Sequence, residues 1–304
     1  MYTAHFGLTG LPFGITPDTS FIYAHPSYQD ALNTLLVCVR SGEGFIKVSG
    51  EVGTGKTLLC RKLLDSLGEG FVTAYIPNPY LEPMTLLLAV ADEFGVDCAS
   101  NANQHQLLRS ITAFLLDVHG RGKRAVLCLD EAQAMPVETL EALRLLSNLE
   151  TERRKLLQVV LFGQPELDTR LSDPSIRQLR QRISFSCRLA AMGPDEVECY
   201  LAHRLAIAGY RRPRLFSRQA VRALHDASRG IPRLVNILAH KALIAAFGEG
   251  AQLVGLRHAR EAIADTESTR PHLAAHALRI LRTAAAVLAF LLVSAGVLIW
   301  EFHA

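Results

Sequence analysis

The chain has 304 residues, a formal net charge of +3 and a hydrophobic content of 49%. This length holds one large or two modest domains, and the apolar content excludes a chain that is disordered throughout. The small positive charge does not by itself indicate a nucleic-acid partner. The 6 cysteines include no C-x-x-C pair, and the 11 histidines show no metal-binding spacing. We therefore expect free thiols in a reducing cytosol, and neither a disulfide framework nor a metal centre built from cysteine or histidine.

Turn-forming and aromatic residues dominate the start of the chain, which we interpret as an N-terminal strap over residues 1–40. Such a strap could pack on the core or cover a ligand, and the sequence leaves both open. Within it, residues 28–39 carry apolar side chains at helical spacing and predict a helix.

Residues 50–57 read GEVGTGKT and fit the phosphate-binding pattern G-x-x-x-x-G-K-[ST]. A predicted strand before the motif and a predicted helix after it provide the setting that such a loop needs. We expect positive φ at the glycines, so that backbone N–H groups can approach phosphates at a helix N-terminus. Lys56 would reach the β- and γ-phosphates of ATP, and the Thr57 hydroxyl would bind Mg²⁺. The predicted nucleotide contacts in the loop are Gly50, Glu51, Val52, Gly53, Thr54, Gly55, Lys56, Thr57 and Leu58.

Strands alternate with helices through the next part of the chain. The unbroken apolar run at 125–129 is typical of a strand buried on both faces of a parallel sheet. The alternation predicts a doubly wound α/β domain over residues 41–190. Its predicted strands are 45–48, 71–76, 125–129, 156–162 and 183–189, and its predicted helices are 58–64, 83–94, 103–119, 137–150 and most of 165–182.

Two acids follow the strand at 125–129, at the carboxyl end where open α/β sheets bind their ligands. We predict that Asp130 holds Mg²⁺ through water. Glu131 is placed to orient and polarise the water that attacks the γ-phosphate. The alternative, that both acids only cap the following turn, has less support because the phosphate-binding loop already predicts such a strand end.

Beyond residue 190 only helices are predicted, and they form a small all-α lid over residues 191–266. The first begins at Gly193-Pro194-Asp195-Glu196, with proline at its first position and acids in its first turn. The others cover about 217–228, 232–247 and 257–267. The lid segment 204–233 contains several arginines but only one acid, Asp226, and could form a nucleic-acid surface, a solvated face, or a face toward anionic lipid or an acidic partner. These arginines are Arg211, Arg212, Arg214, Arg218, Arg222 and Arg229.

Residues 283–300 carry no charged side chain. At about 1.5 Å per residue they would span roughly 27 Å, close to the hydrocarbon thickness of a bilayer. We predict a single transmembrane helix here, after a linker at 267–282 and before a tail at 301–304. Arg279 and Arg282 before this helix place residues 1–282 in the cytoplasm by the positive-inside rule, so that only the tail would emerge on the other side. An alanine-rich buried or coiled-coil helix is the alternative.

The order of several motifs resembles that of an AAA+ ATPase of the P-loop NTPase class. More narrowly, the chain is similar over roughly residues 1–265 to the family of the general secretion pathway A protein and the MSHA-type pilus biogenesis ATPase. The motifs are GEVGTGKT at 50–57, LCLDEAQ at 127–133, LFGQPEL at 161–167, LRQRI at 179–183 and GIPRLVN at 230–236.

The resemblance also implies roles for four further residues. Gln164 matches the position of sensor 1, and Arg233 matches sensor 2, an arginine of the lid that reaches the γ-phosphate. Arg180 and Arg182 match the segment that gives an arginine finger to the nucleotide of a neighbouring subunit, and the sequence does not choose between them. Arg177 is a weaker candidate for the same role.

The sequence as a whole therefore predicts an ATPase that uses ATP and Mg²⁺ in a ring-forming homo-oligomer. The resemblance implies a bacterial inner-membrane location, a membrane-protein partner, and a role in assembling a type II secretion or MSHA-like type IV pilus system. The first alternative is a DNA-handling AAA+ ATPase, such as a transposition helper or an initiator-like protein, although we do not expect nucleic acid as a partner. The second is a scaffold that binds ATP and hardly hydrolyses it.

Overall fold

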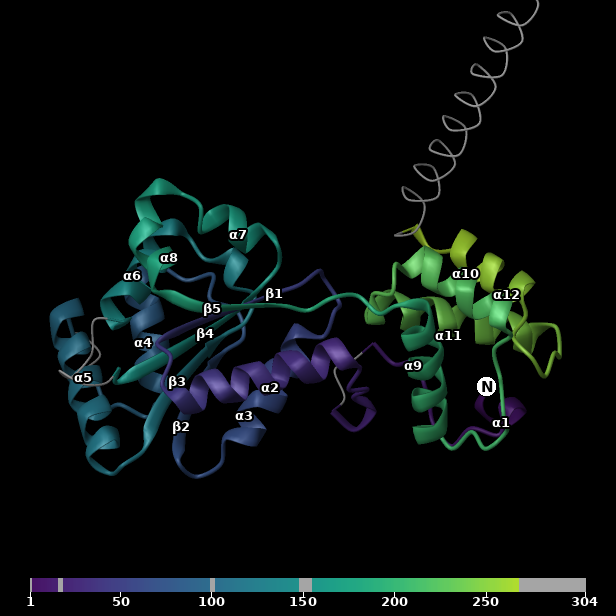
Figure 1. Cartoon of the computed structure of the whole chain (residues 1–304), viewed down its shortest axis with the longest axis horizontal. Coiled ribbons are helices and arrows are strands. Elements are labelled where there is room, and N and C mark those ends of the chain that lie inside the picture. Colours follow the sequence, from purple (N-terminus) through teal and green to yellow (C-terminus); the bar gives the residue numbers. More distant parts are fainter. Residues whose placement is uncertain (1, 16–18, 99–101, 148–154, 268–304) are drawn as a thin grey trace, which may run out of the picture. The chain divides into compact units, whose positions relative to one another are not determined.

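The structure, a computed structural model, describes residues 2–15, 19–98, 102–147 and 155–267 (Figure 1). The chain divides into two compact units. The sheet unit consists of Ile15–Met192 together with Ile231–Arg233. Of the described residues, the helical unit contains 2–14, 193–230 and 234–267.

The sheet unit is built on a 5-stranded sheet with the strand order β2-β3-β4-β1-β5. Every neighbouring pair is parallel, which confirms the predicted α/β class. All residues of β4 are buried, as the apolar runs in the sequence predict for a central strand. The strands are β1 (Phe45–Ser49), β2 (Phe71–Ile76), β3 (Arg124–Leu129), β4 (Leu157–Gly163) and β5 (Ile183–Arg188).

Helices cover both faces of this sheet, and alternate strand residues point to each. Ile46 and Val48 of β1 belong to the apolar cluster formed with α2 (Pro26–Ser41) and α3 (Lys56–Leu67). Phe45 faces the opposite cluster, which includes α4 (Pro83–Glu93), α5 (Gln104–Gly120) and α6 (Val137–Ser147). Figure 1 shows α2 and α3 together on one side of the sheet.

The segment predicted as mostly helical before β5 is divided into short pieces. They are α7 (Glu166–Arg170), the 3₁₀ turn η3 (Pro174–Ile176) and α8 (Arg177–Arg182). The break has a local cause, because the Asp173 side chain caps η3 by accepting the backbone N–H of Ser175 at 2.9 Å. Two other 3₁₀ turns of the unit are η1 (Thr19–Phe21) and η2 (Ala132–Ala134).

Within its described residues, the helical unit contains the helices predicted for the lid and one more. Its helices are α9 (Pro194–Ile207), α10 (Arg218–Ser228), α11 (Pro232–Gly248) and α12 (Leu256–Ala264), preceded by the short α1 (Tyr2–Phe6). The first two residues of α11, Pro232 and Arg233, belong to the sheet unit. Among the lid arginines, Arg214 pairs with Glu198 and Arg212 donates to Gln252 Oε1 at 3.1 Å. These two side chains therefore have polar partners inside the unit.

The N-terminal residues differ from the predicted strap at 1–40, because those up to Gly14 belong to the helical unit. Thr9 donates its backbone N–H to the Ala208 carbonyl at 2.8 Å. The buried Arg204 donates through Nε to the Pro12 carbonyl at 2.6 Å. Aromatic side chains of this segment are buried in the unit, which explains why it packs there.

Within the described ranges, no helix is both long enough and apolar enough to cross a membrane. The transmembrane helix predicted at 283–300 and the tail at 301–304 lie outside the described residues, as does the linker after residue 267.

Candidate nucleotide-binding site

The glycine-rich loop joins the carboxyl end of β1 to the amino end of α3. Gly53 and Gly55 have φ angles of 84° and 98°, a region that glycine enters without a steric penalty. Gly50 does not have the positive φ that we predicted. A Cβ on Gly50 would instead lie 2.8 Å from Thr54 Oγ1 and 3.1 Å from Leu189 Cβ. Position 50 therefore needs glycine for close packing rather than for its backbone angles.

Lys56 lies inside this loop at the first residue of α3. Its ammonium donates hydrogen bonds to the carbonyls of Gly50 at 2.8 Å and Glu51 at 3.0 Å. Burial lowers the pKa of Lys56 from its usual value, while the carboxylates of Glu131 and Asp130 act in the opposite direction. A cation at a helix N-terminus, where backbone N–H groups have no partner in their own helix, suits the binding of phosphate oxygens.

The other predicted loop contacts differ in how their side chains lie. Thr54 is buried, and its Oγ1 donates to the Glu51 carbonyl at 2.8 Å, which closes the turn. Glu51 and Val52 have exposed side chains, so their contribution to a phosphate site would come from the backbone. Leu58 is half-buried in the first turn of α3.

Thr57 on α3 and Asp130 after β3 are in direct contact. The Thr57 hydroxyl donates to Asp130 Oδ2 at 2.5 Å, and only 2% of Asp130 is exposed. Burial raises the pKa of Asp130, while the hydrogen bonds from Thr57 and from the backbone N–H of Glu131 act to lower it. A hydroxyl and a carboxylate are the oxygen donors that Mg²⁺ accepts beside phosphate oxygens and water. The residues present therefore fit a magnesium ion bound jointly with a nucleotide.

Glu131 adopts a left-handed backbone conformation, with φ 52° and ψ 35°, which non-glycine residues adopt at a cost of about 1–2 kcal/mol. Its Oε2 accepts hydrogen bonds from the side-chain amides of Gln133 and of Gln164, the latter at 3.1 Å. Gln164, at the end of β4, also donates its backbone N–H to Gln133 Oε1 at 3.0 Å. The structure thus brings Gln164 to Glu131 and adds Gln133, for which the sequence predicted no role.

Arg233 lies against the loop at the start of α11. Its backbone N–H donates to the Gly53 carbonyl at 3.2 Å, and a Cβ on Gly53 would lie 2.5 Å from Arg233 Cβ. Pro232 stands at the first position of this helix, where its missing N–H costs no hydrogen bond. The Arg233 residue is exposed, so its guanidinium is accessible to a ligand held by the loop.

Arg180 and Arg182 lie on α8, directly before β5, at the other end of the sheet. Ile183 of β5 pairs with Phe45 at the amino end of β1, whereas the loop follows Ser49 at the carboxyl end. At about 3.3 Å per residue, the two ends of β1 are roughly 13 Å apart. Within one chain the structure therefore does not bring these arginines together with Lys56.

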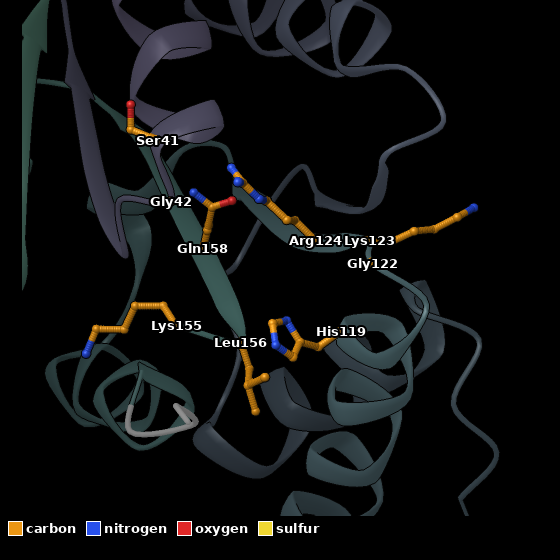
Figure 2. Close-up of a pocket in the computed structure, with 9 residues that line it drawn as sticks. All are labelled: Ser41, Gly42, His119, Gly122, Lys123, Arg124, Lys155, Leu156 and Gln158. Atoms are coloured by element: carbon orange, nitrogen blue, oxygen red, sulfur yellow. The ribbon is translucent and has the colours of Figure 1, made fainter. Parts of the chain in front are cut away.

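A separate hollow of about 410 Å³ lies at the amino ends of β3 and β4 (Figure 2). Gln158 lines it and donates from Nε2 to the carbonyls of Val39 at 2.9 Å and Glu43 at 3.0 Å. In Figure 2 the ammonium groups of Lys123 and Lys155 point in opposite directions, so these cations do not converge on one point. None of the predicted nucleotide contacts lines this hollow.

The AAA domain family matches residues 39–171. The chain is 43% identical over 254 residues to general secretion pathway protein A of Aeromonas hydrophila, an alignment that covers 84% of this chain and 46% of that protein.

Solved structures with a similar fold share little sequence with the chain. Cdc6p from Pyrobaculum aerophilum gives a TM-score of 0.59 at 19% identity, over 79% of this chain and 68% of that one. The ORC2 protein of Aeropyrum pernix in its ADP form gives a TM-score of 0.59 at 18% identity, over 83% of this chain and 73% of that one. The RuvB Holliday junction branch migration motor of Thermotoga maritima gives a TM-score of 0.51 at 16% identity, over 78% of this chain and 67% of that one. At these identities the likeness shows the fold alone.

The chain spans about half the length of its curated relative, 46%, so the whole activity of that protein does not transfer to it. The matched domain contains the loop, Asp130 and Glu131, and it ends within the helices that follow β4. Sequence identity extends well beyond this domain. The chain therefore belongs to the AAA+ ATPases related to general secretion pathway protein A.

Proposed function

We propose that the chain hydrolyses ATP to ADP and phosphate by attack of water on the γ-phosphate. The observation that carries this proposal is the contact of Thr57 with Asp130 at 2.5 Å. This contact joins the phosphate-binding loop to the strand end that bears Glu131. The loop and the acid pair thereby form one site, with phosphate-binding groups and a base side by side.

Each residue of this site has a distinct task in the proposed reaction. The loop N–H groups and Lys56 hold the phosphates. Thr57 and Asp130 would hold Mg²⁺, which when bound offsets the charge on the β- and γ-phosphate oxygens. Glu131 accepts a proton from the attacking water. Gln164 contacts Glu131 at the end of β4, where sensor 1 is expected.

The arginines extend the site in two ways. Arg233 would reach the γ-phosphate from the start of α11. Arg180 and Arg182 lie at the opposite end of the sheet from the loop, so we assign them to the nucleotide of a neighbouring subunit. This arrangement supports a ring-forming homo-oligomer, because each nucleotide would then need residues from two chains.

For the cellular role, we propose assembly of a type II secretion or MSHA-like type IV pilus system. The support is the 43% identity to general secretion pathway protein A. The predicted helix at 283–300 would tether the chain to the bacterial inner membrane, with the ATPase in the cytoplasm and a membrane protein of the assembly system as partner. A membrane fractionation followed by co-purification tests this role. Recovery of the full chain in the soluble fraction would contradict the tether.

Phosphate release with Mg²⁺ and ATP tests the enzymatic proposal. We expect Lys56→Ala to lose both nucleotide binding and hydrolysis, because it removes the cation inside the loop. Glu131→Gln should keep nucleotide binding in calorimetry and lower hydrolysis by about 10²–10⁴-fold, the usual contribution of a general base. Lys62→Ala removes an exposed lysine from the same helix and serves as the matched control. Equal rates in wild type, Lys56→Ala and Glu131→Gln would refute the proposal.

A further inference from the structure

Gln133 connects two strand ends through both ends of one side-chain amide. Its Nε2 donates to Glu131 Oε2, and its Oε1 accepts the backbone N–H of Gln164 at 3.0 Å. Gln164 Nε2 donates to the same oxygen of Glu131 at 3.1 Å, so the three residues close a ring of hydrogen bonds. Glu131 follows β3 and Gln164 directly follows β4, and these strands are neighbours in the sheet.

We propose that Gln133 is a positioning residue that fixes the carboxylate of Glu131 for the hydrolytic step and links it to Gln164. This inference rests on the proposed function, because it places Gln133 in the same reaction. Both amides of the ring donate to Oε2. Oε1 is therefore the oxygen of Glu131 that is left to accept a proton from water.

The ring requires a glutamine at position 133. A primary amide carries a donor and an acceptor in one group, whereas an ionised carboxylate offers no donor and would repel Glu131. Asparagine has one methylene fewer, so it cannot reach both partners from the same backbone position. The amide also fits closely, because a Cβ on Gly163 would lie 3.3 Å from Gln133 Oε1.

The ring matters because the backbone alone does not fix the direction of the Glu131 side chain. The left-handed conformation at φ 52° sets where the side chain begins, and rotation about its single bonds decides where the carboxylate lies. An error of about 1 Å in the position of a reacting group can lower a rate by roughly 10²-fold. Two amide donors on one oxygen remove most of that freedom.

Steady-state hydrolysis and calorimetry on the full chain test this role. Gln133→Met keeps the length of the side chain and removes both hydrogen bonds, while Gln133→Glu keeps the acceptor and loses the donor. We expect both variants to lower kcat by about 10- to 100-fold, with the KM and the dissociation constant for Mg·ATP within roughly 2-fold of wild type. Gln29→Ala is the matched control, because it removes an exposed amide bonded to Asn33 on α2.

A double variant separates positioning from a general effect on the site. If Gln133 acts through Glu131, adding Gln133→Met to Glu131→Gln should lower the residual rate by less than about 2-fold. Losses that multiply would show that Gln133 acts independently, which would overturn the inference. Single-turnover measurements with excess enzyme make these low rates accessible.

The outcomes distinguish this inference from the proposed function. A wild type that hydrolyses ATP and a Gln133→Met that does so at the same kcat would overturn the inference and leave the ATPase proposal standing. A parallel loss of nucleotide affinity would also overturn it, because Gln133 would then only support the fold of the loop. A wild type no faster than Lys56→Ala would remove the proposed function and, with it, the reaction in which Gln133 takes part. Melting temperatures identify a variant that fails to fold. If Gln133→Met fails to fold, the kcat of Gln133→Glu decides between these outcomes.

Discussion

Replacing Gly53 by alanine tests the contact between the phosphate-binding loop and Arg233, both of which belong to the sheet unit. A Cβ on Gly53 would lie 2.5 Å from Arg233 Cβ and 3.3 Å from Ile231 Cγ2. Rotation of the arginine side chain cannot relieve the shorter contact, because Cβ is bonded directly to the backbone. Either the loop or the backbone of Ile231–Arg233 must therefore shift, and the hydrogen bond from Arg233 N–H to the Gly53 carbonyl would be strained with it.

The expected loss of stability has two parts. Alanine in the left-handed region costs about 1–2 kcal/mol, and φ at Gly53 is 84°. Overpacking adds about 1–3 kcal/mol. Gly42→Ala isolates the first part, because Gly42 is in the left-handed region at φ 89° and ψ 23° and its Cβ would meet nothing within 4 Å. The difference of about 1–3 kcal/mol corresponds to roughly 2–12 °C in melting temperature, at about 2–4 °C per kcal/mol for a domain of this size.

Thermal unfolding without nucleotide measures this difference. Arg233→Gly removes the opposing Cβ, so in the Gly53→Ala background it should recover part of the loss. Arg233→Ala keeps that Cβ and should recover none. Equal losses in Gly53→Ala and Gly42→Ala would refute the reasoning, because the loop would then not be packed against Arg233.

Three further predictions follow from the same structure. Burial raises the pKa of Asp130 above its ordinary value of 3.8, so the ionised group destabilises the fold as pH rises through that raised pKa. Asp130→Asn should therefore raise the melting temperature at neutral pH without Mg²⁺, and a lower melting temperature would contradict this reasoning. Wild type should also need more Mg²⁺ for half-maximal hydrolysis as pH falls. An inactive Lys56→Ala chain should restore hydrolysis when mixed with Arg180→Ala or Arg182→Ala, whichever removes the finger, and no gain in either mixture would argue against action between subunits. Asn103→Ala should cost about 1 kcal/mol in denaturant unfolding, because it removes the cap of α5, and an unchanged midpoint would show that the cap does not stabilise the protein.

The sequence predicts most elements of the sheet unit because their patterns are local. Apolar runs mark strands that are buried on both faces, and Asn103 marks the start of α5 at the position the structure shows. The order of the strands is not local. β1 lies between β4 and β5, and this depends on how helices far apart in sequence pack across the sheet, which no short pattern records.

The residues of the site also differ in whether a local sequence pattern reveals them. Lys56 and Thr57 belong to one continuous motif, and Asp130 ends a recognisable strand, so all three can be found from the chain alone. Gln133 cannot, because its partner Gln164 follows a different strand, β4, and the role of an amide at position 133 depends on the hydrogen bond between them. The signal available in the sequence is only that a polar residue closely follows two acids at a strand end.

The first residues of the chain were the least predictable part. Turns and aromatic side chains indicate that a segment packs against something, but they do not indicate which unit receives it. The partners of residues 2–14 are backbone carbonyls and buried side chains of the helical unit. These groups have no recognisable pattern in the sequence, because every residue has a carbonyl.

Residues 2–14 pack against residues that the ribosome makes much later. His5 Nε2 lies 2.9 Å from the carbonyl of Ala251, 246 residues away, and Arg204 binds the carbonyl of Pro12 across 192 residues. At about 5–20 residues per second, the segment waits roughly 10–50 s for these partners. During that interval its aromatic side chains are open to chaperones and to other nascent chains. A tag fused ahead of these residues would therefore interfere with the last stage of folding rather than the first.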